Sequence, residues 1–154
     1  MSSTANNRHK KGVSSASCGS YQEAIDAFNE VIALNPEHAE AYYNRGQVYY
    51  RNRGDIRQAI RDYDRAIELN PGYAEAYCSR GVVYENLADY RQMLRDYDRA
   101  IELNPKFAKA YYLRGYAYWK LGDIEQAIKD MKVASMLGSK AAQDYLKARH
   151  IEWR

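Results

Sequence analysis

The block RDYDRAIELNP occurs twice in the chain, at Arg61 to Pro71 and at Arg95 to Pro105, and a looser copy, DAFNEVIALNP, ends at Pro36. The Asn-Pro pairs that end the three copies lie 35 and 34 residues apart. Self-similarity at a fixed period of this length is typical of proteins built from stacked structural repeats. The period therefore predicts the architecture before local propensities are considered.

A second block precedes each copy: AYYNRGQVYY, AYCSRGVVYE and AYYLRGYAYW. In the first of these, Tyr42, Gly46 and Tyr49 fall on one side of a 3.6-residue helix, and the other two blocks repeat this spacing. Small residues such as Ala59 and Ala66 keep helical spacing in the following block and allow close helix approach. Each period is therefore predicted to be two amphipathic helices, the first with a glycine notch.

Each turn between the paired helices combines a residue suited to a helix C-terminus with an aspartate suited to an N-cap. The Asn-Pro pair ends each second helix, because proline disfavours helical geometry in the residue before it. The turns are Gly54-Asp55, Ala88-Asp89 and Gly122-Asp123. The expected helices are 20–34, 38–53, 55–69, 73–87, 89–103, 107–121, 123–137 and 139–151.

This pattern resembles the tetratricopeptide repeat (TPR), a helix-turn-helix unit of 34 residues with an aromatic, a glycine and a tyrosine in its first helix. The match covers roughly Glu37 to Gly138, and half of another repeat, Tyr21 to Pro36, precedes it. The resemblance implies an all-α fold, a right-handed superhelical α-solenoid with a C-terminal capping helix, formed by a single domain over residues 1–154. Its expected parts are a degenerate first repeat (1–36), three further repeats (37–71, 72–105 and 106–138) and the capping helix (139–154).

The chain departs from the family pattern at two recurrent charged positions. The usual leucine before the notch glycine is an arginine in every repeat, and an aspartate recurs in the second helix. We hypothesise that each arginine bridges to an aspartate of its own or a neighbouring repeat; the alternative is that both are simply solvated. The arginines are Arg45, Arg80 and Arg114, and the aspartates are Asp62, Asp96 and Asp130. One extra residue between Gly46 and Gly54 is interpreted as an insertion in the turn, without a function.

The two ends of the array differ in quality. Residues Met1 to Ser20 lack the expected aromatics, so a degenerate or fraying helix is expected there. The alternative is that the face of Tyr21 to Leu34 is uncovered, and is occupied by another copy or by an upstream part of a longer protein. The last helix is expected to cap the stack, with Ala142, Tyr145, Leu146 and Trp153 inward and its charged residues outward.

Several function classes find no support in the sequence. A net charge of +3, from 23 basic and 20 acidic residues, is too weak for phosphate-backbone binding. No run of 18 apolar residues predicts a membrane span, and no secretory signal is recognised. Catalytic motifs and cofactor sites are absent, and His9, His38 and His150 look like ordinary surface residues. We therefore expect no enzyme, cofactor or metal. Cys18 and Cys78 suggest reduced thiols and an intracellular, cytoplasmic protein.

The resemblance implies a concave groove, lined by the first helices, that binds peptides or partner helices. Four of its tyrosines are expected to lie off the packing face, although such residues also fill the seams between repeats. In the fourth repeat two lysines flank an aromatic strip, which suits an acidic peptide. The expected lining is Tyr43, Gln47, Tyr50, Arg51, Cys78, Val82, Glu85, Asn86, Lys109, Tyr112, Tyr116, Trp119 and Lys120.

The function that these features favour is a non-enzymatic protein-interaction scaffold that binds a peptide or helix in the groove. The alternatives are a self-assembly element that associates through its end helices, and a regulatory segment of a larger enzyme. The lysine and asparagine clamp by which some family members hold the acidic tail of heat-shock chaperones matches here at only one position in each register. The partner is therefore expected to be recognised by another chemistry.

Overall fold

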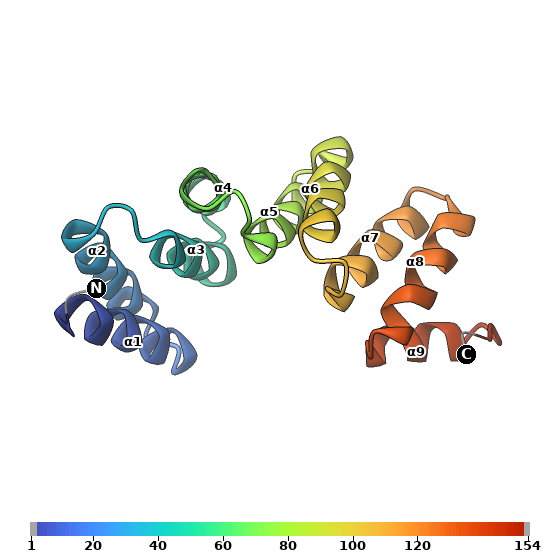
Figure 1. The fold of residues 1–154 in the computed structure, drawn as a ribbon, viewed down its shortest axis with the longest axis horizontal. Helices are drawn as coiled ribbons and strands as arrows, with labels where there is room; N and C mark the ends of the chain where they lie inside the picture. The colour runs from blue at the N-terminus through green and yellow to red at the C-terminus, as the bar shows by residue number, and fades with distance from the viewer. Residues whose placement is uncertain (1–2, 153–154) are drawn as a thin grey trace. The chain divides into compact units, whose positions relative to one another are not determined.

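The computed structural model describes residues 3–152, and every regular element among them is helical. Figure 1 shows these helices in chain order from blue to red. Their bounds lie within about two residues of the expected ones, except at the two ends of the chain. The helices are α1 (Ser3–Ser17), α2 (Tyr21–Leu34), α3 (Ala39–Val48), the π-helical turn η1 (Tyr49–Arg53), α4 (Ile56–Leu69), α5 (Ala74–Asn86), α6 (Tyr90–Leu103), α7 (Ala108–Lys120), α8 (Ile124–Met136) and α9 (Lys140–Lys147).

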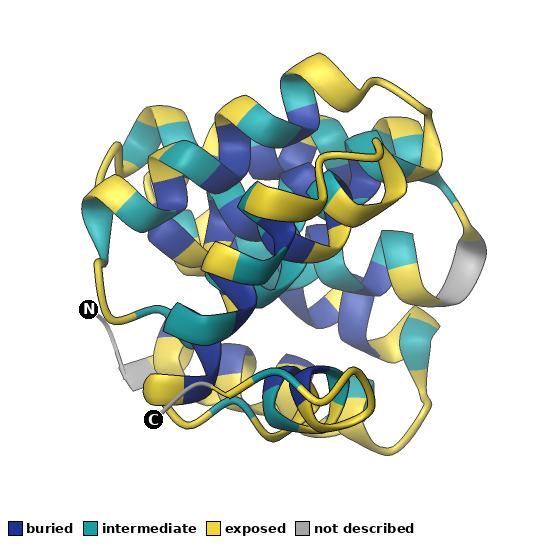
Figure 2. Ribbon diagram, turned by 90° about the vertical axis from the view of Figure 1, so that its right-hand side faces the viewer, coloured by how far each residue is buried: buried dark blue, intermediate teal, exposed yellow. Residues whose placement is uncertain are grey.

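By its internal contacts the chain divides into two compact units, the first ending at Val83 and the second beginning at Tyr84. Unit 1 holds α1 to α4 and most of α5, and unit 2 holds the end of α5 and α6 to α9. Within them, α1 packs on α2, α3 on α4 and α7 on α8, so that sequence neighbours form helical hairpins. Burial follows one face of each helix (Figure 2), as the 3.6-residue periodicity predicts.

The predicted glycine notches are where paired helices come closest. A Cβ atom added to Gly46 would lie 3.0 Å from the Tyr63 ring, and one added to Gly115 would lie 3.0 Å from Cβ of Asp130. At Gly12, in α1, the added atom would lie 2.7 Å from the Phe28 ring. A side chain at these positions would push the two helices apart, which explains why the notch recurs.

Aspartate caps begin the second helices, as predicted. Asp55, Asp89 and Asp123 each accept a backbone N–H three residues ahead, at 3.1, 3.1 and 3.2 Å respectively. These bonds satisfy donors that a helix start leaves without an intrahelical partner, and each is worth about 1 kcal/mol.

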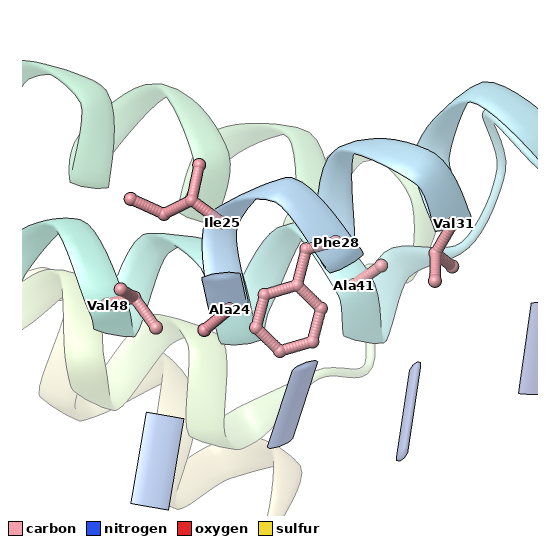
Figure 3. Packing of buried hydrophobic residues seen from close by; sticks show 6 residues of the cluster. All are labelled: Ala24, Ile25, Phe28, Val31, Ala41 and Val48. Atoms are coloured by element: carbon pink, nitrogen blue, oxygen red, sulfur yellow. The ribbon is translucent and has the colours of Figure 1, made fainter. Parts of the chain in front are cut away.

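The apolar core of unit 1 begins where α2 packs on α3. Ala24, Ile25, Phe28 and Val31 of α2 are buried together with residues of α3 (Figure 3). Each helix of this chain presents too narrow an apolar stripe to be stable alone, so the contacts between helices carry the stability.

The first helix is better formed than its sequence suggests. Helix α1 covers α2, and Ala5, His9 and Gly12 are buried. The alternative of an uncovered α2 face, occupied by another copy or an upstream segment, is therefore wrong for this structure. Small residues explain the outcome, because Gly12 lets the Phe28 ring lie directly against the α1 backbone.

His9 and His38 are not the surface residues that we expected. Both are buried, and their rings stack with centroids 5.0 Å apart. His38 Nδ1 accepts the backbone N–H of Ala41 at 3.3 Å and so caps α3, and His9 Nε2 lies 3.0 Å from the Asn44 amide nitrogen. The sequence positions of these histidines give no information about their burial, because that burial depends on how α1 lies against α3.

The interpretation of the extra residue as an insertion in the turn is wrong. The extra residue is absorbed within the helix as the π-helical turn η1, in which Gly54 N–H donates to the Tyr49 carbonyl. Such one-turn bulges keep the flanking helical bonds and shift the side chains that follow them. Gly54 then ends the helix at a φ of 59°, in the left-handed region.

The capping role of the last helix is confirmed, although α9 ends at Lys147, earlier than residue 151. Ala142 and Leu146 are buried against Met131 and Ala134 of α8, and Tyr145 packs beside them. The charged residues of α9 are exposed, as expected. Trp153, which we expected to point inward, lies outside the described residues.

Two of the recurrent arginines, Arg45 and Arg114, form the predicted bridges to the recurrent aspartates. Arg45 donates from Nε and Nη2 to the Asp62 carboxylate at 2.8 and 2.6 Å, and Arg114 donates in the same way to Asp130 at 2.7 and 2.8 Å. These are bidentate bonds between the two helices of one hairpin, and the arginine side chains are only 18 and 20% exposed. Burial raises the pKa of the Asp62 carboxyl, although the hydrogen bonds and charge of Arg45 oppose the rise.

The third nitrogen of each arginine reaches back to the preceding hairpin. Arg114 Nη1 donates to Asp98 at 2.7 Å, Arg80 Nη1 to Asp64 at 2.6 Å, and Arg45 Nη1 to Asn29 at 2.6 Å. Sequence reasoning missed these acceptors, although Asp64 and Asp98 are the second aspartate of the RDYDRA block and Asn29 holds the equivalent position in the looser copy. We call this arrangement the arginine clasp. In it, the guanidinium of a first helix is bound to the second helix of the preceding hairpin, and Arg45 and Arg114 are also bound to the second helix of their own hairpin.

Replacing Ala88 with glycine should stabilise the chain. Ala88 has a φ of 56°, a left-handed conformation that the equivalent Gly54 and Gly122 adopt more readily. Relief of this strain outweighs the extra backbone freedom of glycine, so a gain of roughly 0.5 to 1 kcal/mol is expected in urea unfolding. Gly122→Ala is the matched reverse change and should destabilise by a similar amount. If both variants unfold at the wild-type midpoint, the strain is not real.

Acidification should destabilise unit 1 through His9. Burial lowers the pKa of His9, Glu40 raises it and His38 lowers it further, with a net downward shift. Because the folded-state pKa lies below the unfolded value of about 6.5, the unfolded chain takes up the proton first, and stability is lost as the pH falls below that value. Urea midpoints at about pH 7.5 and 5.5 should differ less in His9→Phe than in the wild type. Equal losses in the two proteins would contradict this assignment.

Candidate functional site

The predicted groove residues are divided between the two compact units. Within unit 1 they lie on α3, η1 and α5, and within unit 2 on the end of α5 and on α7. Each part is a strip of first-helix side chains, and each has its own geometry.

Tyr43 packs into a seam and is not the exposed aromatic that we expected. Its ring lies 4.9 Å from that of Tyr73 and 5.9 Å from that of Tyr63, and its hydroxyl is 3.5 Å from Ser79 Oγ. The Gln47 amide donates to the same hydroxyl. Burial raises the pKa of Tyr43. The α3–α5 seam therefore holds both Tyr43 and Gln47, as the alternative interpretation predicted.

Tyr50 and Tyr112 are likewise packed rather than free. Tyr50 lies against the buried cluster of Ala59, Tyr63 and Val83, and Tyr112 lies against that of α8 and α9. The expectation that these two tyrosines stand off the packing face is wrong. The helical periodicity of one segment cannot show this, because the atoms that cover each ring come from other helices: α4 and α5 for Tyr50, and α8 and α9 for Tyr112.

Cys78 must also be removed from the groove lining, because it is only 1% exposed. Its thiol cannot touch a ligand without a rearrangement of α5. Val82 is half-buried, whereas Arg51 and Asn86 are exposed. In the described part of the chain both cysteines are free thiols, with Cys18 exposed.

Helix α7 carries the exposed aromatic surface. The rings of Tyr116 and Trp119 stack with centroids 5.7 Å apart and an interplanar angle of 30°. Both residues are 36 and 39% exposed respectively, and the other aromatics of the predicted groove, Tyr43, Tyr50 and Tyr112, are half-buried. The fourth repeat was the predicted position for such a strip, and the structure places these two side chains together there.

Lys120 joins this pair but is not a free positive charge. Its ammonium lies 5.8 Å from the Tyr116 ring centroid and 3.0 Å from Glu85 Oε1, on the end of α5. The hydrogen bond and charge of Glu85 raise the pKa of Lys120. The charges of Lys120 and Glu85 therefore largely compensate each other. We call Glu85, Tyr116, Trp119 and Lys120 the α7 strip.

Lys109 and Tyr112 come together at the other end of α7. They line a hollow of about 440 Å³ with Leu113 of α7, with Leu137 in the α8–α9 turn and with Ala141 of α9. Lys109 is exposed, so its ammonium can meet a carboxylate at the edge of this largely apolar hollow. Of the two lysines expected to attract an acidic ligand, Lys109 is the better placed.

Exposed apolar residues also flank two turns of unit 2, and sequence reasoning missed them. Leu87 and Tyr90 lie on either side of the α5–α6 turn, and Leu121 and Ile124 lie on either side of the α7–α8 turn. The sequence could have indicated them, since the two residues of each pair lie on either side of a predicted aspartate cap. Their large exposed fractions, between 37 and 49%, extend the apolar surface of unit 2.

Among residues 3–152 no three His, Cys, Asp or Glu side chains gather in a way that could hold an ion. None of the helices described is both long enough and apolar enough to cross a bilayer. The chemistry available on the α7 strip is therefore apolar contact, aromatic stacking and hydrogen bonding to a polar partner.

Comparison with solved structures finds close relatives of the fold. A crystal structure of MamA is 30% identical, with a TM-score of 0.79 over 90% of this chain and 81% of that one. The first TPR of Spaghetti (RPAP3), bound to the HSP90 peptide SRMEEVD, is 28% identical, with a TM-score of 0.74 over 79% of this chain and 96% of that one. YrrB, described as a TPR protein with an unusual peptide-binding site, is 24% identical, with a TM-score of 0.76 over 96% and 76%, and supports the fold alone.

The family assignment rests on the sequence as well as on the fold. No curated protein matches the chain. The TPR repeat family, however, matches residues 15–52, 50–87 and 89–122, which together are more than half of its length. The hairpins described above and their notch glycines Gly46 and Gly115 are the structural form of this match. The chain belongs to the TPR repeat family.

Proposed function

We propose that this chain is a protein-interaction module, and that it binds a peptide segment or a partner helix along α7. The observation that carries the proposal is the stacked, exposed pair of Tyr116 and Trp119 beside an ion pair. Tyrosine and tryptophan dominate binding hot spots because they bury a large area at little cost in side-chain entropy. The match to the RPAP3 domain with its bound peptide supports binding of this kind.

The chemistry of the strip suggests what the partner presents. Apolar side chains of the partner would cover Tyr116 and Trp119, and the Lys120–Glu85 pair would meet polar groups at the edge. An acidic residue of the partner would reach Lys109 rather than Lys120, whose charge is compensated. The partner is thus an amphipathic segment with a carboxylate at one end.

The remaining features fit a binding protein inside the cell. Two free thiols suit a reducing, cytoplasmic compartment. Self-association through the end helices is less favoured, since α1 covers the face of α2 that would otherwise be exposed. Molar mass measured over a series of protein concentrations would test it. A catalytic role has no candidate residues among those described, so we propose that the chain acts by binding alone.

Truncating the two aromatics should abolish tight binding. Peptides selected from a random library on the wild-type protein are expected to lose about tenfold or more in affinity against Tyr116→Ala/Trp119→Ala, measured by fluorescence anisotropy. Both side chains are exposed, so the variant should keep its helical circular dichroism. Leu34→Ala/Met136→Ala removes two exposed apolar side chains elsewhere and should bind normally. Unchanged affinity in the aromatic variant would reject the α7 strip.

A further inference from the structure

We propose that unit 1 carries a second binding site, a hollow between α1 and α3 that receives an aromatic side chain of a partner with a carboxylate beside it. Gln47 and Arg51 of the predicted groove line this hollow, its other lining residues lie outside that groove, and the site is independent of the α7 strip. Its argument rests on shape, on the internal repeat and on charge.

The hollow has the size of one aromatic ring. Its volume is about 160 Å³, and Val13, Ala16, Phe28 and Val48 give it apolar walls. An apolar cavity of about 150 Å³ accepts a benzene ring. Phe28 is fully buried at the base of the hollow, so an entering ring would contact the more accessible Val13 and Ala16.

The repeat explains why the hollow exists and what fits it. Ala16 stands four residues after Gly12, and the equivalent positions after Gly46, Gly81 and Gly115 carry Tyr50, Glu85 and Trp119. Tyr50 packs its ring on the buried cluster of Ala59, Tyr63 and Val83. Alanine at the equivalent position of α1 leaves room where Tyr50 carries a ring, so an aromatic side chain of a partner is a group of suitable size for the hollow.

The charge at the edge of the hollow indicates which residue of the partner lies next to its aromatic residue. Arg51, on the π-helical turn η1, lines the hollow and is exposed, and no carboxylate is among the lining residues. The amide nitrogens of Asn44 and Gln47 already face His9 and Tyr43. The available charged donor is therefore the Arg51 guanidinium, which suits a carboxylate bidentately. The partner segment thus places an aspartate or glutamate next to its aromatic residue.

Titration of the ¹⁵N-labelled full chain with short blocked peptides tests the site directly. The probe is acetyl-Ser-Phe-Glu-Ser-amide, and its matched controls replace Phe with Ala or Glu with Gln. We expect saturable amide shifts at Val13, Ala16, Val48 and Arg51 for the probe. Affinity should fall about tenfold or more without the ring and a few-fold without the carboxylate.

Three variants separate this site from a nonspecific effect. Ala16→Tyr fills the hollow and should remove the shifts, whereas Ser14→Tyr adds the same bulk to an exposed position of α1 outside the lining and should keep them. Arg51→Gln is an exposed change that cannot unfold the core, and it should make the Glu and Gln peptides bind equally. The proposal is overturned if the wild type shows no saturable shifts there, if Ala16→Tyr folds and still binds, or if Arg51→Gln keeps the preference for Glu. None of these outcomes bears on α7.

Discussion

The arginine clasp is the interaction on which the rest of the structure depends. A half-buried guanidinium on a first helix is bound to the preceding hairpin, as in Arg80 with Asp64, and in Arg45 and Arg114 to the same hairpin as well. Charge-assisted bonds of this kind are worth about 1.5 to 3 kcal/mol each when shielded, and less where the carboxylate is exposed. A leucine at the same position could only pack. The arginine also fixes direction, because its planar fork donates to carboxylates in one geometry, and so it sets how one hairpin meets the next.

This division of labour separates positions that build the stack from positions that are free to bind. Notch glycines, caps and clasps occupy equivalent sites in successive hairpins, and Tyr43, Tyr50 and Tyr112 are packed against neighbouring helices. What remains exposed differs from repeat to repeat: a stacked aromatic pair at Tyr116 and Trp119, and an alanine at Ala16 that leaves a hollow. Both candidate sites therefore arise from differences between the copies, on a frame made by their similarities.

The period and the spacing of small residues predicted most of the fold, because notches, caps and proline ends act locally. The π-helical turn could not be predicted, since an extra residue between Gly46 and Gly54 fits a turn or a helix equally well in sequence. Helix α1 was underestimated because its stability comes from contact with Phe28 and not from its own propensity. The site was only partly predictable: burial of Cys78 or Tyr43 is decided by other helices, and the pairing of Lys120 with Glu85 joins residues 35 positions apart.

A double-mutant cycle between Arg114 on α7 and Asp98 on α6 tests the clasp most directly. Arg114→Leu introduces the family's usual residue, Asp98→Ala removes the acceptor on the preceding hairpin, and urea unfolding gives the free energy of each single and double variant. If the clasp joins consecutive hairpins, the two changes should be coupled by about 1 kcal/mol, because either one alone already breaks the bond. Free energies that add to within about 0.3 to 0.5 kcal/mol would show that the two residues merely lie near each other, and would contradict the account.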